Sequence, residues 1–217
     1  SSDVCSSDLK ALQTQINPHF LFNALNAIAS SIRINPQKAR ELIINLSSYL
    51  RYNLELNDEF IDINDELQQV RNYIEIEKAR FGDKINVVCD VDDVNVKIPS
   101  LIIQPLVENA IYHGLKNYDD KGKVIVAIEY FNDELKITIE DTGIGMTEDE
   151  LKKVINGNIS SSAKGGFAVK NTIERLKLVY HNNCIFNIKS QKNKGTTITL
   201  VIPAIRKDLY RDEYTFS

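Results

Sequence analysis

The chain has 217 residues, 43% of them hydrophobic, which is enough to bury a substantial core as one domain or as a domain with a helical appendage. Its formal net charge of -4 and its sequence pI near 5.5 argue against a nucleic-acid-binding protein. Three widely spaced cysteines, Cys5, Cys89 and Cys184, argue against a disulfide framework or a zinc site and favour a reducing, cytosolic setting. Cys89 and Cys184 fall in strand patterns, where we expect them to be buried. No apolar stretch reaches the roughly 20 residues of a membrane helix, and no signal peptide is visible.

The first part of the chain has a helical pattern. Residues 1–8 nearly repeat themselves and are set aside as a tail or an assembly scar. From Leu9 to Ile32, apolar residues recur at helical intervals. A second helix is predicted where Asn35 can act as the N-cap and Pro36 can occupy the first turn.

Neither of these helices can bury its apolar stripe alone, and a two-helix hairpin is a poor domain. Pairing with a second copy into a four-helix bundle solves the problem, so the sequence predicts a homodimer. The two stripes consist of Leu12, Ile16, Leu21, Leu25, Ile28 and Ile32, and of Ala39, Leu42, Ile43, Leu46, Tyr49, Leu50 and Leu54.

The remaining elements indicate an α+β fold. A third helix is predicted over 65–81, with Gly82 as its stop, and after it the period changes to that of strands. The helical hairpin is then followed by a two-layer α/β sandwich: an antiparallel sheet with helices on one face. We expect a dimerisation region at 9–82, a sandwich domain at 83–205 and a tail at 206–217. The predicted elements of the sandwich are strands at 85–91 and 94–98, a helix at 100–113 stopped by Gly114, a hairpin of 123–131 and 134–141 around Asn132-Asp133, a helix after Thr147, a mobile loop at 156–166, a helix at 167–181, and a hairpin of 184–191 and 196–202.

Two segments of the sandwich indicate a nucleotide site. Asn109 places an amide oxygen on an apolar helix, where it could bind a hard cation that bridges phosphates. Asp141 ends a strand and is followed by Gly143 and Gly145, which allow a sharp turn close to a flat ligand. An aspartate accepts a hydrogen bond from the amino group of adenine and repels the carbonyl group of guanine, so the site favours ATP over GTP.

Several motifs in this order resemble those of one enzyme family. They are the segments 13–23, 46–52, 73–81 and 98–114. Together they are similar to the sensor histidine kinases of two-component systems, in the LytS/YesM-like subgroup, and the resemblance covers nearly everything from Leu9 to Pro203. The catalytic half of these kinases has the ATP-binding (Bergerat) fold shared with gyrase, Hsp90 and MutL.

The resemblance assigns roles to individual residues. It implies that ATP phosphorylates His19, that Asn109 holds Mg²⁺, and that Asp141 reads adenine with close backbone approach at Gly143 and Gly145. Glu108 or Asn23 would orient or deprotonate the imidazole, and the sequence does not choose between them. Around the nucleotide the resemblance also implies roles for Gly166, with Asn171 nearby, in the lid over the phosphates, and for Thr196, which supports Asp141. His113 fits either a phosphate contact or a helix terminus.

The sequence departs from the family in three places. Ala168 stands where the lid of the subgroup has its second glycine, and Phe20 follows His19 where many other histidine kinases have an acid. Pro105 stands where related ATPases have a water-activating glutamate, which favours transfer over hydrolysis.

The resemblance also implies partners and a location. The expected partner is the receiver domain of a response regulator, which would accept the phosphoryl group on an aspartate. The expected setting is the cytoplasm of a bacterium, below a missing N-terminal sensor region that spans the membrane. Two alternatives remain: a degenerate nucleotide-binding dimer without kinase activity, suggested by Ala168, and an ATPase or serine kinase of the same superfamily.

Overall fold

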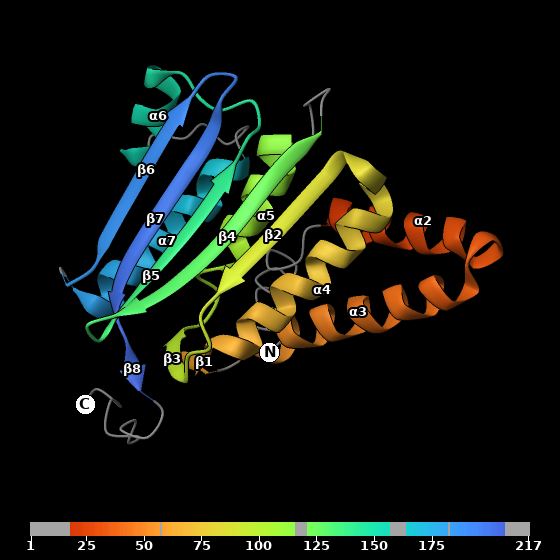
Figure 1. The fold of residues 1–217 in the computed structure, drawn as a ribbon, viewed down its shortest axis with the longest axis horizontal. Coiled ribbons are helices and arrows are strands. Elements are labelled where there is room, and N and C mark those ends of the chain that lie inside the picture. Colours follow the sequence, from red (N-terminus) through yellow and green to blue (C-terminus); the bar gives the residue numbers. More distant parts are fainter. Residues whose placement is uncertain (1–17, 57, 116–120, 157–163, 182, 207–217) are drawn as a thin grey trace, which may run out of the picture. The chain divides into compact units, whose positions relative to one another are not determined.

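The computed structural model describes residues 18–56, 58–115, 121–156, 164–181 and 183–206 (Figure 1). The chain forms two compact units, which are described separately. The first comprises Ser1–Asp58 and Gln68–Gly82, and the second Glu59–Leu67 and Asp83–Ser217. No helix in the described ranges is long and apolar enough to cross a membrane.

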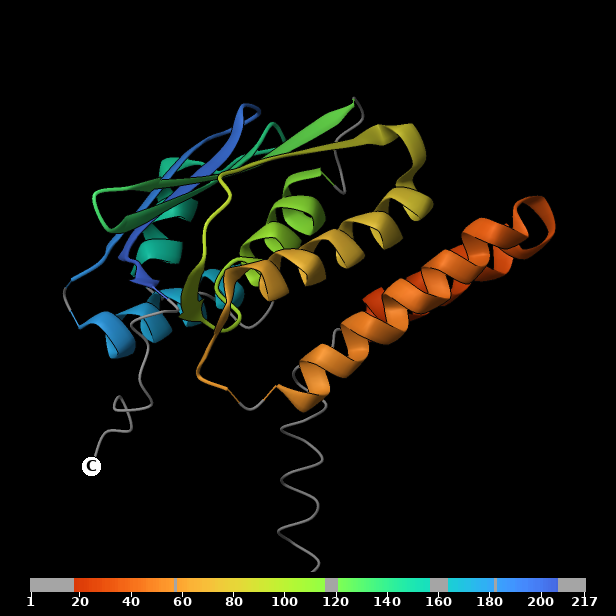
Figure 2. The ribbon, with the colours of Figure 1, turned by 60° about the horizontal axis from the view of Figure 1, so that its bottom comes forward.

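A helical hairpin forms most of the first unit. Helix α2 (Pro18–Ile34) and helix α3 (Pro36–Glu55) run side by side in opposite directions (Figure 2). The predicted cap is confirmed, because the Asn35 side chain accepts a hydrogen bond from the Lys38 backbone N–H at 3.0 Å. The hairpin buries Phe20, Ala24, Ile28, Ala39, Leu42, Leu46 and Tyr49.

Helix α4 (Ile63–Phe81) joins this hairpin through its residues after position 67. The Nζ of Lys38 lies 2.9 Å from Glu75 Oε2, and the Asn72 amide donates to the Ser48 hydroxyl at 3.1 Å. The helix ends as predicted, since Gly82 follows it with a φ of 61°.

The main sheet of the second unit has the strand order β2-β4-β5-β7-β6. Most pairs are antiparallel, but β2 and β4 are parallel, so the prediction of an antiparallel sheet was wrong for this pair. The reason is that the chain between them crosses over through a helix and returns in the same direction. The strands are β2 (Ile85–Val91), β4 (Gly122–Phe131), β5 (Glu134–Asp141), β6 (Ile185–Gln191) and β7 (Gly195–Pro203).

Helices α5 and α7 lie on one face of this sheet, as predicted for a two-layer sandwich (Figures 1 and 2). Strand β5 buries Leu135, Ile137 and Ile139, whereas the alternating residues are more exposed. The turn Asn132-Asp133 is confirmed, with φ values of 51° and 60°. The helices of this unit are α5 (Gln104–Asn109), α6 (Glu148–Ile155) and α7 (Lys164–Tyr180).

The observed helix differs at both ends from the one predicted over 100–113. It begins only at Gln104, because Leu101 has a φ of 57°, which a right-handed helix cannot accommodate. It then continues as a π-helical segment (Ala110–Leu115), so Gly114 does not stop it.

A second, three-stranded sheet was not predicted. It consists of β1 (Phe60–Asp62), β3 (Val96–Pro99) and β8 (Ile205–Arg206), in the order β1-β3-β8. Through β1, residues 59–67 group with the second unit, although we expected them in the helical region. The prediction for Cys89 was also wrong, because this residue is exposed on β2, while Cys184 is half-buried.

Candidate functional site

Asp141 is a buried carboxyl group at the end of β5, with only 5% of its surface exposed. The Gly143 backbone N–H donates to its Oδ1 at 2.9 Å, and the backbone of Thr196, its partner on β7, also hydrogen-bonds to the carboxyl group. Burial raises the pKa of Asp141 to about 6, and the nearby charge of Glu140 adds to the rise, while the two backbone hydrogen bonds oppose it. At pH 7 the group is therefore an ionised acceptor in a poorly solvated site.

Glycines let three backbone segments meet at this carboxyl group. A Cβ on Gly114 would lie 2.7 Å from Asp141 Oδ1, and one on Gly143 would overlap with the Gly114 carbonyl oxygen. That same carbonyl accepts a hydrogen bond from the Ile144 N–H at 3.0 Å. Gly145 has a φ of 54°, and its Cβ position faces the Gln191 carbonyl oxygen. In the structure, Gly143 and Gly145 are required by neighbouring protein backbone and Gly114 by the Asp141 carboxyl group.

Ser190 holds the loop after Asp141 against β7. Its hydroxyl accepts a hydrogen bond from the Met146 N–H at 2.8 Å, donates to the Gly195 carbonyl at 3.1 Å, and lies 2.9 Å from the Thr196 hydroxyl. Ser190 belongs to none of the motifs named from the sequence. The available signal was the predicted hairpin, whose register places it opposite Thr196.

Asn109 is the last residue of α5 and is half-buried. The π-helical segment that follows contains His113, whose side chain the structure does not describe, and reaches Asp141 through Gly114. Glu108 Oε1 accepts a hydrogen bond from the Gln104 amide at 2.9 Å. One helical run therefore connects the amide of Asn109 with the Asp141 loop.

The predicted lid residues Gly166 and Asn171 both lie on α7. Gly166 falls within the first turn of the helix, which begins at Lys164, three residues earlier than expected. Asn171 is exposed on α7, a helix that packs against α5. The predicted loop at 156–166 falls mostly outside the described residues, which exclude 157–163.

The donor groups fit a magnesium ion that is shared with phosphates. In the parts of the chain that the structure describes, no three His, Cys, Asp or Glu side chains cluster as a metal site. Mg²⁺ in nucleotide sites needs only one or two protein ligands, because phosphate oxygens and water supply the others. The single amide oxygen of Asn109 is compatible with this arrangement.

His19 lies in the first turn of α2, in the first unit, and is exposed. The amide of Asn23, one turn further along, lies 3.0 Å from His19 Nδ1 and 3.5 Å from Nε2. At this distance the Asn23 amide contacts the imidazole, so Asn23 stays a candidate to orient the ring. The Asn23 amide is thus within hydrogen-bond range of both ring nitrogens and lies closer to Nδ1.

Phe20 anchors the turn that carries His19. Its ring is 5% exposed, and its centroid lies 5.0 Å from those of Tyr49 and Tyr73. A carboxylate at this position would be desolvated among aromatic rings. The departure at Phe20 thus has a structural cause: the residue after His19 belongs to the core, and the histidine points away from it.

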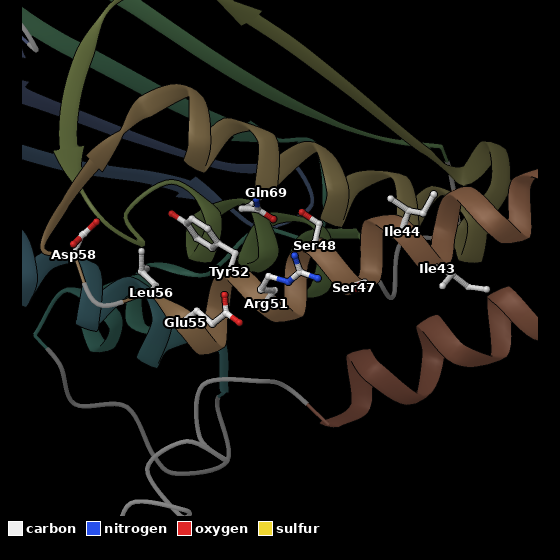
Figure 3. Close-up of a pocket in the computed structure, with 10 residues that line it drawn as sticks. All are labelled: Ile43, Ile44, Ser47, Ser48, Arg51, Tyr52, Glu55, Leu56, Asp58 and Gln69. Atoms are coloured by element: carbon white, nitrogen blue, oxygen red, sulfur yellow. The ribbon is translucent and has the colours of Figure 1, made fainter.

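A groove of about 750 Å³ runs along α3 in the first unit (Figure 3). Figure 3 shows both charged and apolar side chains along it, including Arg51, Glu55 and Ile43. None of the predicted nucleotide or phosphoacceptor residues lines this groove.

Comparison with protein families identifies both halves of the chain. Residues 7–85 match the family model described as histidine kinase. Residues 94–206 match the model for the histidine kinase-, DNA gyrase B-, and HSP90-like ATPase. The chain belongs to the sensor histidine kinase family. The match to the ATPase model implies ATP binding in the second unit.

Curated members of this family are similar over most of the chain. Sensor histidine kinase YpdA of Escherichia coli is 48% identical over 91% of the chain, and sensor histidine kinase/phosphatase LytS of Staphylococcus aureus is 34% identical over 93%. The aligned regions cover 34% and 35% of these relatives, so the chain spans about a third of their length.

The same architecture is present in a solved member of the family. The histidine kinase domain of the blue-light activated kinase EL346 from Erythrobacter litoralis superposes with a TM-score of 0.51 at 21% identity, covering 90% of this chain and 92% of that one. This likeness supports the helical region followed by an α/β sandwich.

Proposed function

We propose that this chain transfers the γ-phosphoryl group of ATP to His19 and that a response regulator then accepts the group on an aspartate. The observation that carries the proposal is the exposed His19 imidazole, held at Nδ1 by the Asn23 amide. A neutral imidazole is a competent nucleophile near pH 7. Membership in the sensor kinase family supplies the reaction class.

The second unit would bind the nucleotide. Asp141 accepts a hydrogen bond from the adenine amino group, and its burial strengthens this interaction because water competes poorly there. Thr196 and Ser190 keep the carboxyl group and its loop in place. Asn109 would hold Mg²⁺, which neutralises phosphate charge, while His113, Gly166 and Asn171 would lie near the phosphates.

The transfer itself needs few protein groups. The attacking imidazole nitrogen forms a bond to the γ-phosphorus as the bond between that phosphorus and the ADP oxygen breaks, and the imidazole proton leaves to a base or to water. Asn23 is positioned to orient the ring. Glu108, beside Asn109 on α5, remains a candidate base.

We further propose that the kinase works as a homodimer below a membrane-spanning sensor in a bacterium. Leu25, Ile32, Ile43 and Leu54, which belong to the predicted stripes, stay about half exposed in the single chain. A four-helix bundle formed with a second copy would cover them. We propose a dimerisation region at 9–82 and an ATP-binding region at 83–205. Residues 59–67 of the first region pack with the second unit.

Labelling with γ-labelled ATP and Mg²⁺ tests the kinase proposal. We expect acid-labile, alkali-stable label on the protein, as for a phosphoramidate, and at least a hundredfold less in His19→Gln, which removes the nucleophile but lies outside the nucleotide unit. Asn26→Gln is a matched control on the exposed side of α2. Persistent label in His19→Gln would contradict the assignment. Nucleotide binding without any label would favour the degenerate dimer, and steady phosphate release without label would favour the ATPase.

A further inference from the structure

Glu66 is a completely buried carboxyl group outside the residues assigned to catalysis. It lies in the first turn of α4, in the part of this helix that belongs to the second unit. None of the ion pairs among the described residues includes Glu66, and its Oε2 has no hydrogen-bond partner there. Burial raises the pKa of Glu66 to about 7. Such a costly group calls for a compensating role.

The partners of Glu66 are the backbone N–H groups that begin α5. Its Oε1 accepts from the Ile103 N–H at 2.6 Å and from the Gln104 N–H at 3.1 Å. The N-cap residue Ile103 offers no side-chain acceptor of its own. Glu66 therefore caps α5 from a distant part of the sequence, satisfying N–H groups that every helix leaves open at its start.

The helix that Glu66 caps is short and carries a proposed metal ligand. A helix of six residues has little intrinsic stability, so its position depends on what holds its ends. Asn109 is its last residue, and the π-helical segment beyond it is fixed at Gly114 against Asp141. Glu66 holds the other end.

We propose that Glu66 is a positioning residue for the nucleotide site: by capping α5 it fixes where Asn109 is presented to the phosphates and their metal ion. This inference rests on the proposed role of Asn109 in binding Mg-ATP. In this role, Glu66 needs a side chain long enough to reach the backbone N–H groups of Ile103 and Gln104, and does not need its negative charge.

Two conservative substitutions separate reach from charge. Glu66→Gln keeps an oxygen acceptor at the same distance and removes the charge, whereas Glu66→Asp keeps the charge and shortens the side chain by one methylene. We expect calorimetry of the full chain with Mg-AMPPNP to give affinities within about twofold of the parent for Glu66→Gln and about tenfold weaker for Glu66→Asp. Asp65→Asn, an exposed acid in the same turn, is the matched control and should leave the affinity unchanged.

A double-mutant cycle with Asn109→Ala distinguishes positioning from a general structural role. If Glu66 acts through Asn109, Glu66→Asp should weaken Mg-AMPPNP binding by no more than about twofold when Asn109 is already alanine. The inference would be overturned if the affinity losses of the two single variants multiplied in the double variant. It would also be overturned if Glu66→Asp bound Mg-AMPPNP as tightly as the parent. Unchanged binding in Asn109→Ala alone would overturn the role of Asn109 as well, which distinguishes failure of the proposed site from failure of Glu66.

Discussion

Asp141 is buried yet ionised at neutral pH. Removal of its carboxylate from water costs free energy, and two backbone hydrogen bonds recover only part of that cost. The protein is thus less stable than it would be with a neutral group at this position. An N–H group of a bound ligand would complete the hydrogen bonding of this carboxylate. The free energy of folding that is lost by burying the group can then contribute to the affinity for the ligand.

The affinity for ADP should decrease as the pH falls below about 6. Protonation of Asp141 removes the acceptor for the adenine amino group, and loss of a hydrogen bond to a charged group weakens binding by about tenfold or more. The measurement is a calorimetric titration with ADP between pH 5 and 8. Asp141→Asn should bind weakly throughout and lack this pH dependence, whereas Glu140→Gln, at its exposed neighbour, should keep the parent's affinity at pH 8 and show the same decrease at a slightly lower pH, because the charge of Glu140 adds to the raised pKa. Equal pH profiles of the parent and Asp141→Asn would contradict the assignment.

The stability of the unliganded protein should follow the opposite trend. Because burial raises the pKa of Asp141 above its ordinary value of 3.8, the neutral form is favoured in the folded state. The stability that comes from this group is complete below pH 3.8 and is lost as the pH rises through about 6. The urea midpoint of the parent should therefore decrease over this range relative to that of Asp141→Asn.

Local motifs in the sequence pointed to most of the proposed site residues. Asp141, Gly143 and Asn109 stand in recognisable segments, and His19 has Asn23 one turn away. Glu66 could not be selected in this way, since its partner Ile103 lies 37 residues distant along the chain. The hairpin register could have pointed to Ser190 opposite Thr196, but its contact with Met146 spans 44 residues. Nothing in the local sequence of α4 shows that a glutamate there will cap another helix.

The loop after β5 is an element that only glycine permits. Its two glycines face carbonyl oxygens of other segments, so the loop is fixed by packing before any ligand arrives. Towards α6, the Met146 N–H donates to the Ser190 hydroxyl. We therefore expect the loop to be largely preformed in the absence of nucleotide.

Gly143→Ala should destabilise the second unit by about 3 kcal/mol, because its Cβ would overlap with the Gly114 carbonyl oxygen and force the loop from the helix. Gly82→Ala is the matched control. Gly82 has a φ of 61° but no atom near its Cβ position, so alanine there should cost only about 1 kcal/mol of backbone strain. Urea unfolding of both variants checks the difference. Equal losses would mean that the loop can relax around the added methyl group.

Elements with local signals were predicted well, and those with nonlocal causes were not. The cap at Asn35, the stop at Gly82 and the turn at Asn132-Asp133 follow from side-chain chemistry within a few residues. Strands β1 and β8 are three and two residues long and exist only because β3 pairs with both. The late start of α5 follows from the turn at Leu101.

At the scale of the whole molecule, the exposed apolar residues of α2 and α3 would form the interface of the proposed homodimer. In a twofold-symmetric bundle each substitution occurs twice in the interface. Ile43→Glu should therefore shift the protein from dimer to monomer at micromolar concentration, which sedimentation velocity would measure. Ile185→Glu, at an isoleucine on β6 that is at least as exposed as Ile43, is the control and should remain dimeric. A parent chain that sediments as a monomer at all concentrations tested would contradict the proposal.

Residues 59–67 have a consequence for how such kinases can recombine. The chain passes from the helical unit into the ATP-binding unit at Glu59, returns at Gln68 and leaves again after Gly82. A crossover at Gly82 would graft an ATP-binding unit without its own β1 strand and without the glutamate that caps α5. Functional chimaeras should instead arise from exchanges before Glu59, so that α4 is inherited together with the unit that follows it.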